Sequence, residues 1–437
     1  MGRYTEGGTI AAEATPRGRG GISVVRISGP QSLSIAQQLF DKPLPQPGSF
    51  KFGTLKTVEG DLIDEGVASL FAAHHSYTGE DVVELSIHGS PAVVSLLLDE
   101  IYRLGARPAE PGEFTLRAFL NGRLDLTQAE GVGDLIAASS TQAARQAARQ
   151  MTGKLTQAVE RTAQIVEQLL ALTELELDFV EEDVELTSAD ERLAQIDQAV
   201  IYCQEMLKGY RAARSIREGV KVALLGAPNV GKSSLFNALI GEERAIVHKT
   251  PGTTRDLISA KRVIEGVEFE FFDAAGIRKG EGEIEDEGVR RAVKSAEEAD
   301  IILEVDSVDV PAESQGSKRS ILIRNKADLP HSTAPGRLFV SALNGDGMME
   351  LKAALIKMAI GDEGAGEATV TRERHYQLIS RAMEDLKRGR ELVLNCTPTE
   401  FIAEEWRDAL GLLDELTGKR RLPEILNTIF GEFCIGK

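Results

Sequence analysis

Val220-Lys-Val-Ala-Leu-Leu-Gly-Ala-Pro-Asn-Val-Gly-Lys-Ser233 joins an apolar run to a glycine-rich loop. The apolar half predicts a buried strand, and the second half has the G-x-x-x-x-G-K-S spacing of a phosphate-binding loop. Backbone N–H groups of such a loop, and the start of the helix expected over 234–240, attract phosphate groups. Lys232 is expected to reach the β- and γ-phosphates, and the Ser233 hydroxyl is expected to bind Mg²⁺. The stretch therefore predicts a strand–loop–helix unit that binds a nucleotide.

A second motif indicates which base is bound. Ile321–Asp328 is an apolar strand that runs into Asn325-Lys-Ala-Asp328. The Asp328 carboxylate can accept hydrogen bonds from N1–H and the exocyclic amine of guanine, and adenine lacks this pair of donors. Asn325 is expected to brace the loop, and the Lys326 stem is expected to cover the ring. Asn-Lys-x-Asp is also a common surface turn, but at the end of a strand that follows a phosphate loop it favours guanine.

Three further segments predict the rest of a GTPase site. Val267–Asp273 alternates like a strand and leads into Asp273-Ala-Ala-Gly276. Asp273 is expected to hold Mg²⁺ through water, and the Gly276 N–H is expected to face the γ-phosphate. A threonine of the polar loop Thr250–Asp256 is expected to complete the Mg²⁺ shell while the γ-phosphate is present. Leu338–Leu343 is expected to be a strand followed by a small-residue turn near the guanine edge.

Position 277 departs from the pattern of many small GTPases, which have a water-orienting glutamine after this glycine. The chain has Ile277 there, so either hydrolysis is slow or another group positions the water. The following residues, 278–287, are acidic and punctuated by glycine. They either supply a carboxylate that orients the water or form a solvated acidic loop.

Composition limits the classes of protein to which the chain can belong. Its 437 residues are enough for two to four domains, and 42% hydrophobic and 27% charged residues fit a soluble protein. No apolar run has the roughly 18 residues of a membrane span, and the N-terminus lacks an apolar signal core. The widely spaced Cys203, Cys396 and Cys434 fit a reducing compartment and form no metal-ligand pattern. We therefore expect a cytoplasmic protein without a membrane span.

The formal net charge of −18 bears on nucleic-acid binding. A protein that binds RNA by releasing counterions from phosphates is usually basic. If RNA is a substrate, its contacts must be local, or a partner must supply much of the positive field.

The order of patterns along the chain predicts a GTPase inserted into a helical domain, in a multidomain α/β and α+β protein. We expect an α+β domain over 1–122, a first helical part over 123–218, the GTPase over 219–362 and a second helical part over 363–437. Strands are expected near Thr9, Ile22, Phe50, Gly66 and Val82, and helices near 31–40, 91–104, 129–150, 155–178, 372–395, 401–417 and 422–430.

Several polar motifs lie outside the GTPase segment. Thr15–Gly21 offers backbone amides and arginines suited to an anionic ligand. Tyr77–Asp81 and Asn121–Glu130 place polar residues beside apolar ones, and each is either a site or a turn or helix cap. Phe433–Lys437 carries Cys434, which is either a reactive thiol or an incidental cysteine at a frayed end.

Taken together, these motifs resemble the MnmE (TrmE) tRNA-modification GTPases over the whole chain. The resemblance implies an N-terminal folate-binding and dimerisation domain, a central helical domain and an inserted P-loop, Ras-like GTPase domain. It also implies a homodimer that forms a heterotetramer with the FAD-dependent partner MnmG. That pair modifies carbon-5 of the wobble uridine in tRNA with an aminomethyl-type group, and methylene-tetrahydrofolate supplies the carbon. The most specific motifs are Ala14–Gly21, Tyr77–Asp81, Pro111–Gly122, Leu124–Glu130 and Cys434–Lys437.

The resemblance also implies roles for residues outside the phosphate loop. Arg26, Glu84, Arg123 and Lys437 match positions that contact a 5-formyl- or methylene-tetrahydrofolate, with Arg123 standing where the family often has lysine. Cys434 matches a cysteine linked to the modification chemistry.

In the GTPase, the resemblance implies that hydrolysis needs two G domains face to face and a K⁺ ion in place of an arginine finger. Glu285 matches the water-orienting glutamate, with Lys232 as its catalytic neighbour at the phosphates. Mg²⁺ would be held by Ser233 and Thr254, and Ala274 replaces the family's usual threonine. The implied K⁺ ligands are Asn229, His248, Thr250 and Thr253. The full set expected at the nucleotide and its ions is Asn229, Val230, Gly231, Lys232, Ser233, Ser234, His248, Lys249, Thr250, Pro251, Gly252, Thr253, Thr254, Asp273, Ala274, Ala275, Gly276, Asn325, Lys326, Asp328, Ser341, Ala342 and Leu343.

A GTPase switch for ribosome or ribonucleoprotein assembly is the alternative, because such factors use similar guanine motifs. An assembly factor is expected to carry a basic RNA-binding domain. The acidic composition and the terminal Cys-Ile-Gly-Lys437 favour tRNA modification instead.

Overall fold

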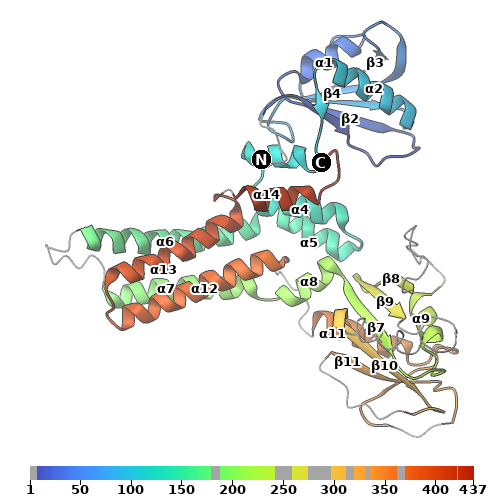
Figure 1. Cartoon of the computed structure of the whole chain (residues 1–437), viewed down its shortest axis with the longest axis vertical. Helices are drawn as coiled ribbons and strands as arrows, with labels where there is room; N and C mark the ends of the chain where they lie inside the picture. Colours follow the sequence, from blue (N-terminus) through green and yellow to red (C-terminus); the bar gives the residue numbers. More distant parts are fainter. Residues whose placement is uncertain are drawn as a thin grey trace, which may run out of the picture. The chain divides into compact units, whose positions relative to one another are not determined.

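The computed structural model describes residues 7–178, 188–241, 258–273, 297–311, 319–330, 334–361, 370–420 and 422–437 (Figure 1). The chain forms two compact units. Unit 1 comprises residues 1–133, 150–199 and 384–437, and unit 2 comprises 134–149 and 200–383. Each unit draws on segments that are far apart in the sequence, as expected when one domain is inserted into another. None of the described helices is long and apolar enough to cross a membrane.

Unit 1 begins with a six-stranded sheet in the order β3-β4-β5-β2-β1-β6. Neighbouring strands are antiparallel except β1 and β6, which are parallel. Two helices, α1 and α2, pack their apolar side chains against Val25, Ile27 and Leu85 on one face of the sheet (Figure 1). The bounds are β1 Ile10–Glu13, β2 Ser23–Ser28, α1 Ser32–Leu39, β3 Phe50–Lys56, β4 Leu62–Phe71, β5 Val82–Ile87, α2 Pro91–Arg103 and β6 Arg107–Pro108.

The helical part of unit 1 contains long helices packed along their lengths. Helices α6 (Lys154–Asp178) and α13 (Thr399–Thr417) lie side by side (Figure 1). The Trp406 ring of α13 is buried against Gly389 of α12 (Glu373–Leu394), where a Cβ would lie 2.5 Å from the ring. The other helices that lie wholly or partly in unit 1 are α3 Glu113–Leu120, α4 Leu126–Ala137, α7 Ala189–Leu207 and α14 Pro423–Gly431, and α5 Thr141–Met151 lies mostly in unit 2.

The helical stretch expected over 129–150 is confirmed, and it consists of two helices. Helix α4 ends at Ala137, and the Ser140 hydroxyl accepts a hydrogen bond of 3.1 Å from the Ala143 N–H at the start of α5. A serine that caps the next helix gives the backbone an alternative to continuing the first one. Helix α4 itself begins with a capping box in which Asp125 accepts from the Gln128 N–H and Gln128 accepts from the Asp125 N–H. The interpretation of the Asn121–Glu130 motif as a helix cap is therefore confirmed.

Unit 2 contains a second six-stranded sheet in the order β12-β11-β10-β7-β9-β8. All neighbours are parallel except β8 and β9, and the buried side chains of α9 and α11 belong to the same apolar core. This is the α/β arrangement in which ligands bind at the carboxyl ends of the strands. The bounds are α8 Tyr210–Glu218, β7 Val220–Leu225, α9 Lys232–Ile240, β8 Ile258–Ile264, β9 Val267–Asp273, β10 Ile301–Ser307, β11 Ser320–Asn325, β12 Leu338–Phe339 and α11 Met348–Ile360. The expected multidomain fold class is confirmed, and so are the other expected strands and helices within the described residues.

One carboxylate ties together the two chain segments that connect this sheet to the helices. Asp134, in the last turn of α4, binds Arg217 just before β7 and Arg372 just before α12, at 3.4 Å and 2.7 Å. Arg217 also donates to the Thr371 carbonyl at 3.1 Å. The entry and exit segments of the inserted sheet are therefore joined to each other and to α4.

Candidate functional site

The phosphate-binding loop lies between β7 and α9, and its glycines are required by close backbone packing. A Cβ at Gly226 would lie 2.0 Å from the Val305 carbonyl, and one at Gly231 would lie 2.3 Å from the Asn325 amide nitrogen. Both glycines have positive φ, which favours glycine. The Lys232 ammonium donates to the carbonyls of Gly226 and Ala227 at 2.9 and 2.7 Å. The ammonium is thus held over the loop where a nucleotide's phosphates would bind.

Asn325, at the end of β11, links the phosphate-binding loop to the loop expected to bind the base. Its Nδ2 donates to the Val230 carbonyl at 3.0 Å, and its Oδ1 accepts from the Ala342 N–H at 3.2 Å. The side chain is only 2% exposed. A buried amide with partners at both ends fixes the two loops relative to each other, because leaving either end unpaired would be costly.

The Asp328 carboxylate is oriented by the next strand. The Ser341 hydroxyl donates to Asp328 Oδ1 at 2.7 Å and accepts from the Asn344 N–H at 3.2 Å. Lys326 has a φ of 61° and donates to Asp309 at 2.8 Å, and this hydrogen bond lowers the pKa of Asp309. Leu343 is exposed at the adjoining turn. The structure therefore brings Asn325, Lys326, Asp328, Ser341 and Ala342 to one edge of the sheet, beside the phosphate-binding loop.

The structure describes only part of the expected phosphate and ion site. Val230 is buried, and Asn229 has a φ of 65°, in the left-handed region that asparagine tolerates. Asp273 ends β9 and pairs with Leu224 of β7, which places it next to the start of the loop. Ser233 and Ser234 lie in the first turn of α9. The expected residues His248, Lys249, Thr250, Pro251, Gly252, Thr253, Thr254, Ala274, Ala275, Gly276 and Glu285 lie outside the described residues.

A second candidate site lies in unit 1, where the N-terminal sheet meets the end of the chain. Arg26 of β2 is the register partner of Glu84 of β5, and its guanidinium binds that carboxylate at 2.8 Å. The same guanidinium donates to the Gly436 carbonyl at 3.3 Å. A Cβ at Gly436 would lie 2.2 Å from the Glu13 carbonyl, so only glycine permits this approach. Strand pairing and one glycine thus bring together residues more than 400 positions apart.

The walls of this site combine positive charge with aromatic rings. Burial lowers the pKa of Lys437, and the positive charge of Arg26 lowers it further, against the opposing effect of Glu84. The Arg26 guanidinium carbon is 5.5 Å from the ring centroids of both Tyr77 and Phe114. Two neighbouring cations and one carboxylate suit a ligand that carries an acidic group and polar ring nitrogens.

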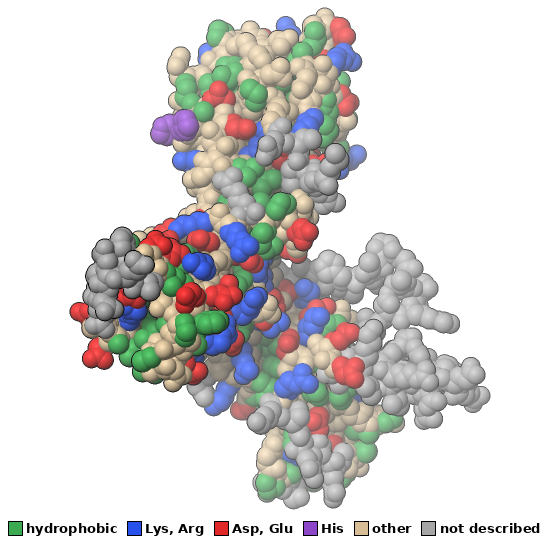
Figure 2. Space-filling view, turned by 60° about the vertical axis from the view of Figure 1, so that its left-hand side comes forward, with side chains coloured by type: hydrophobic (Ala, Val, Ile, Leu, Met, Phe, Trp, Pro, Cys, Tyr) green, Lys and Arg blue, Asp and Glu red, His purple; other side chains and the backbone are tan. Residues whose placement is uncertain are grey.

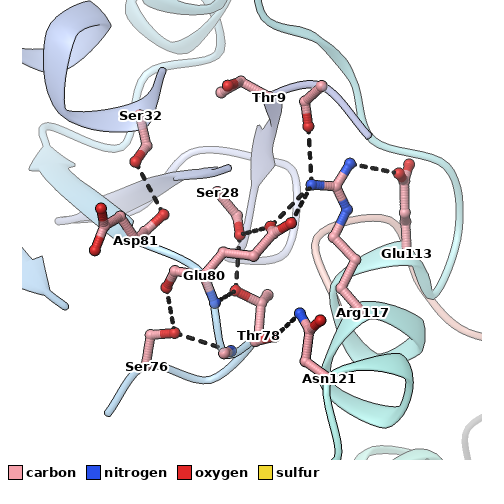
Figure 3. Close-up of polar contacts among 12 residues, drawn as sticks. Thr9, Ser28, Ser32, Ser76, Thr78, Glu80, Asp81, Glu113, Arg117 and Asn121 are labelled. Carbon is pink, nitrogen blue, oxygen red and sulfur yellow. Dashed lines mark hydrogen bonds and ion pairs between the residues drawn. The ribbon is translucent and has the colours of Figure 1, made fainter. Parts of the chain in front are cut away.

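A buried polar network holds one wall of the site in place (Figure 3). Arg117 of α3 binds Glu80 at 2.8 Å and Glu113 at 3.1 Å, and Glu80 accepts from the Ser28 hydroxyl at 2.8 Å. Burial alone would raise the pKa of Glu113, but hydrogen bonds from Arg107 and the charge of Arg117 lower it overall. The network joins the Tyr77–Asp81 motif to the Pro111–Gly122 motif, which between them carry Tyr77 and Phe114.

Sequence reasoning missed Tyr77 and Phe114 as neighbours of Arg26, although both lie within motifs quoted above. The available signal was an aromatic residue inside an otherwise polar motif. Of the residues expected to contact a folate, the structure brings Arg26, Glu84 and Lys437 together. Arg123 lies exposed on the turn after α3, with its Cγ 3.3 Å from a Cβ built at Gly79. Cys434 is exposed, and its carbonyl accepts from the Gly112 and Lys437 N–H groups.

A phosphate loop on the central strand β7, with Asn-Lys-x-Asp two strands away on β11, defines a P-loop guanine-nucleotide-binding protein, joined here to helical and α+β parts. Residues 126–434 match the MnmE helical domain, and residues 9–123 match the N-terminus of the GTP-binding protein TrmE. The tRNA modification GTPase MnmE of Nitrosomonas europaea is 42% identical, over 99% of this chain and all of the relative. Its counterparts in Chlorobium chlorochromatii and Chlorobium phaeovibrioides are each 40% identical over at least 98% of both chains. The chain belongs to the MnmE family.

The Asn325 link generates a prediction about nucleotide affinity. Asn325→Ala removes both hydrogen bonds and is expected to raise the dissociation constant of GDP by about tenfold or more, since two buried partners lose their bonds. Fluorescence titration with a labelled GDP measures this. The matched control is Asn344→Ala, an exposed asparagine in the adjacent turn. Equal affinities of wild type and Asn325→Ala would contradict the bracing role.

Proposed function

We propose that this protein hydrolyses GTP as part of an enzyme that modifies the wobble uridine of tRNA at carbon-5. The proposal that the protein binds GTP rests on the hydrogen bonds of Asn325, which join the phosphate-binding loop to the loop that carries Ser341. Ser341 in turn orients Asp328, the carboxylate proposed to bind guanine. The tRNA part rests on similarity along nearly the full length to relatives named as tRNA modification GTPases. In this proposal residues 1–122, 123–218, 219–362 and 363–437 are the four parts of the chain.

Deletion of the gene tests the tRNA part directly. We expect mass spectrometry of tRNA hydrolysates to show loss of the carbon-5 modification at the wobble uridine, with restoration by the intact gene. Restoration is expected to fail with Asp328→Asn, because an amide in place of the carboxylate mispairs with guanine. Unchanged wobble uridine together with defective ribosome particles would favour the assembly-factor alternative.

The proposed mechanism of GTP hydrolysis also uses residues that lie outside the described part of the chain. When bound, Mg²⁺ supplies charge neutralisation at the phosphates, and Ser233, Thr254 and Asp273 are the residues proposed to hold it or its waters. Lys232 binds and orients the β- and γ-phosphates. Glu285 is proposed to orient the attacking water, because the side chain of Ile277 has no group that can hydrogen-bond to that water. Asn229, His248, Thr250 and Thr253 are proposed K⁺ ligands, in a dimer of G domains.

We expect GTP turnover to be markedly faster in K⁺ than in Na⁺ at equal ionic strength. We also expect Glu285→Ala to abolish turnover while GDP binding stays unchanged, because the side chain acts on water and not on the nucleotide. Phosphate-release assays and nucleotide titrations separate the two effects. Equal rates in the two salts would overturn the K⁺ proposal, and full activity of Glu285→Ala would overturn the role of this carboxylate.

The site in unit 1 formed by Arg26, Glu84 and Lys437 is proposed to bind a tetrahydrofolate derivative, in the methylene or 5-formyl form. Its donor set fits that class of ligand, since Arg26 and Lys437 can pair with carboxylates and Glu84 can accept from ring N–H groups. The bound folate would supply the one-carbon unit. Arg123 is proposed at the rim of this site, and Cys434 is proposed to act in the modification chemistry. A homodimer, a heterotetramer with FAD-dependent MnmG and a cytoplasmic location complete the proposal.

Tetrahydrofolate binding is expected to weaken in Arg26→Ala by tenfold or more, because a buried charged partner is lost. Because the pKa of Lys437 is below its usual value, this side chain is expected to lose its positive charge at a lower pH than an ordinary lysine. The affinity is expected to decrease over the same pH range. Binding of the anion favours the protonated amine, so affinity falls as pH rises. Lys437→Arg is expected to remove this alkaline loss.

Calorimetry across pH measures both effects, with 5-formyl-tetrahydrofolate as the probe. Arg103→Ala is the control, because Arg103 lies in an exposed ion pair with Glu59 on the same domain. Absence of binding to the wild-type protein would refute the folate proposal.

A further inference from the structure

The charge of the chain is distributed unevenly between its parts. Three segments of unit 2 that flank its sheet in the sequence, residues 134–149, 200–218 and 370–383, carry nine basic and four acidic residues. The other 388 residues carry 41 basic and 64 acidic residues. A local excess of five positive charges therefore lies in a protein whose total is −18. On the face shown in Figure 2 basic and acidic side chains are interspersed.

Most of the acidic residues in these segments already have basic partners within them. Asp134 binds Arg217 and Arg372. Glu218 binds Arg214 and Arg217. These contacts use Arg214, Arg217 and Arg372. Apart from Glu373, the remaining acidic residue of the segments is the exposed Glu205, three positions before Lys208, so the basic residues stay in excess.

Glu373 has partners of its own in this region. It accepts from Tyr210 and lies 3.5 Å from Arg214. Burial raises the pKa of Tyr210 to about 12, and the hydrogen bond to Glu373 contributes to this shift, so the phenol keeps its proton and stays a donor. This contact joins the first residue of α8 to the first residue of α12.

Arg145, Arg211 and Arg381 lie on α5, α8 and α12, and Lys208 lies between α7 and α8. Gln146 of α5 donates to the Ala213 carbonyl of α8 at 3.1 Å. The rings of Tyr210 and Tyr376 stack with centroids 4.4 Å apart, which joins α8 to α12. Lys208 precedes Tyr210 by two residues, and Arg381 follows Tyr376 by five. We call Arg145, Lys208, Arg211 and Arg381 the basic surface, and all four are exposed.

We propose that the basic surface binds the phosphate backbone of the tRNA substrate. Its guanidinium and ammonium groups belong to exposed residues, and such groups gain affinity by releasing counterions from RNA. The other residues carry a net negative charge, which disfavours RNA binding to the rest of the chain. This inference rests on the proposed function, because it assumes that tRNA is the substrate.

The test is tRNA binding by the full-length protein as a function of salt, with an unmodified transcript of a substrate tRNA as probe. Lys208→Gln/Arg211→Gln is expected to weaken binding about tenfold near 0.1 M salt. The slope of log K against log salt is expected to fall by about two, since each neutralised contact removes close to one released counterion. GTP hydrolysis without tRNA is expected to stay at the wild-type rate, which shows that the variant is folded.

Arg161→Gln/Lys387→Gln is the matched control, because it neutralises one exposed arginine and one exposed lysine of unit 1. Its affinity and salt slope are expected to equal those of the wild type. An unchanged slope in Lys208→Gln/Arg211→Gln, or an equal fall in the control, overturns the proposal. Unchanged RNA binding with loss of an acidic protein partner would assign the surface to that partner instead.

Failure of this proposal is distinguishable from failure of the proposed function. If the proposed function is correct but the basic surface does not bind tRNA, the Lys208→Gln/Arg211→Gln variant restores wobble-uridine modification in cells that lack the gene. That variant then also binds tRNA like the wild type. If the function is wrong, the deleted cells retain the modification, and the wild-type protein does not bind the transcript.

Discussion

The amide of Asn325 is the contact on which the nucleotide site depends. A phosphate-binding loop is a set of backbone N–H groups that must be held in one conformation, because a mobile loop would lose entropy with each nucleotide it bound. Asn325 supplies that restraint at 2% exposure by joining the Val230 carbonyl to the Ala342 N–H. The parallel pairing of β7, β10 and β11 places the amide there, and Gly231 leaves room for it.

The site around Arg26 in unit 1 shows the same principle with charged groups. Arg26 has three kinds of neighbour: the Glu84 carboxylate, the Gly436 carbonyl and the rings of Tyr77 and Phe114. The rings stay in place because the Glu80–Arg117–Glu113 network ties their two motifs together (Figure 3). A buried charge network of this kind is costly to desolvate and adds little net stability, but it fixes geometry because every partner must be satisfied at once.

The net charge of this protein does not give the local charge at each part of its surface. Electrostatic attraction between exposed groups is screened over about 8–10 Å at ordinary salt concentrations, so a binding partner responds to the nearby charges. A helical region with an excess of five positive charges can therefore attract an anion on a protein whose formal charge is −18. The requirement that RNA contacts be local, which followed from composition alone, has a candidate location in the helices of unit 2.

The sequence by itself determined the features that depend on neighbouring residues. Strand alternation, the phosphate loop, Asn-Lys-x-Asp and most helices were predictable, because each is specified by side-chain periodicity or by backbone groups within a few positions. The pattern over 129–150 predicted helix but did not locate the break, which lies at the Ser140 cap between two helices. Only the tertiary structure decided which distant groups meet. Arg26 reaches Gly436 through strand pairing and a glycine contact, and Asp134 joins Arg217 and Arg372 across 83 and 238 residues. Such contacts depend on the packing of whole elements, which no local pattern specifies.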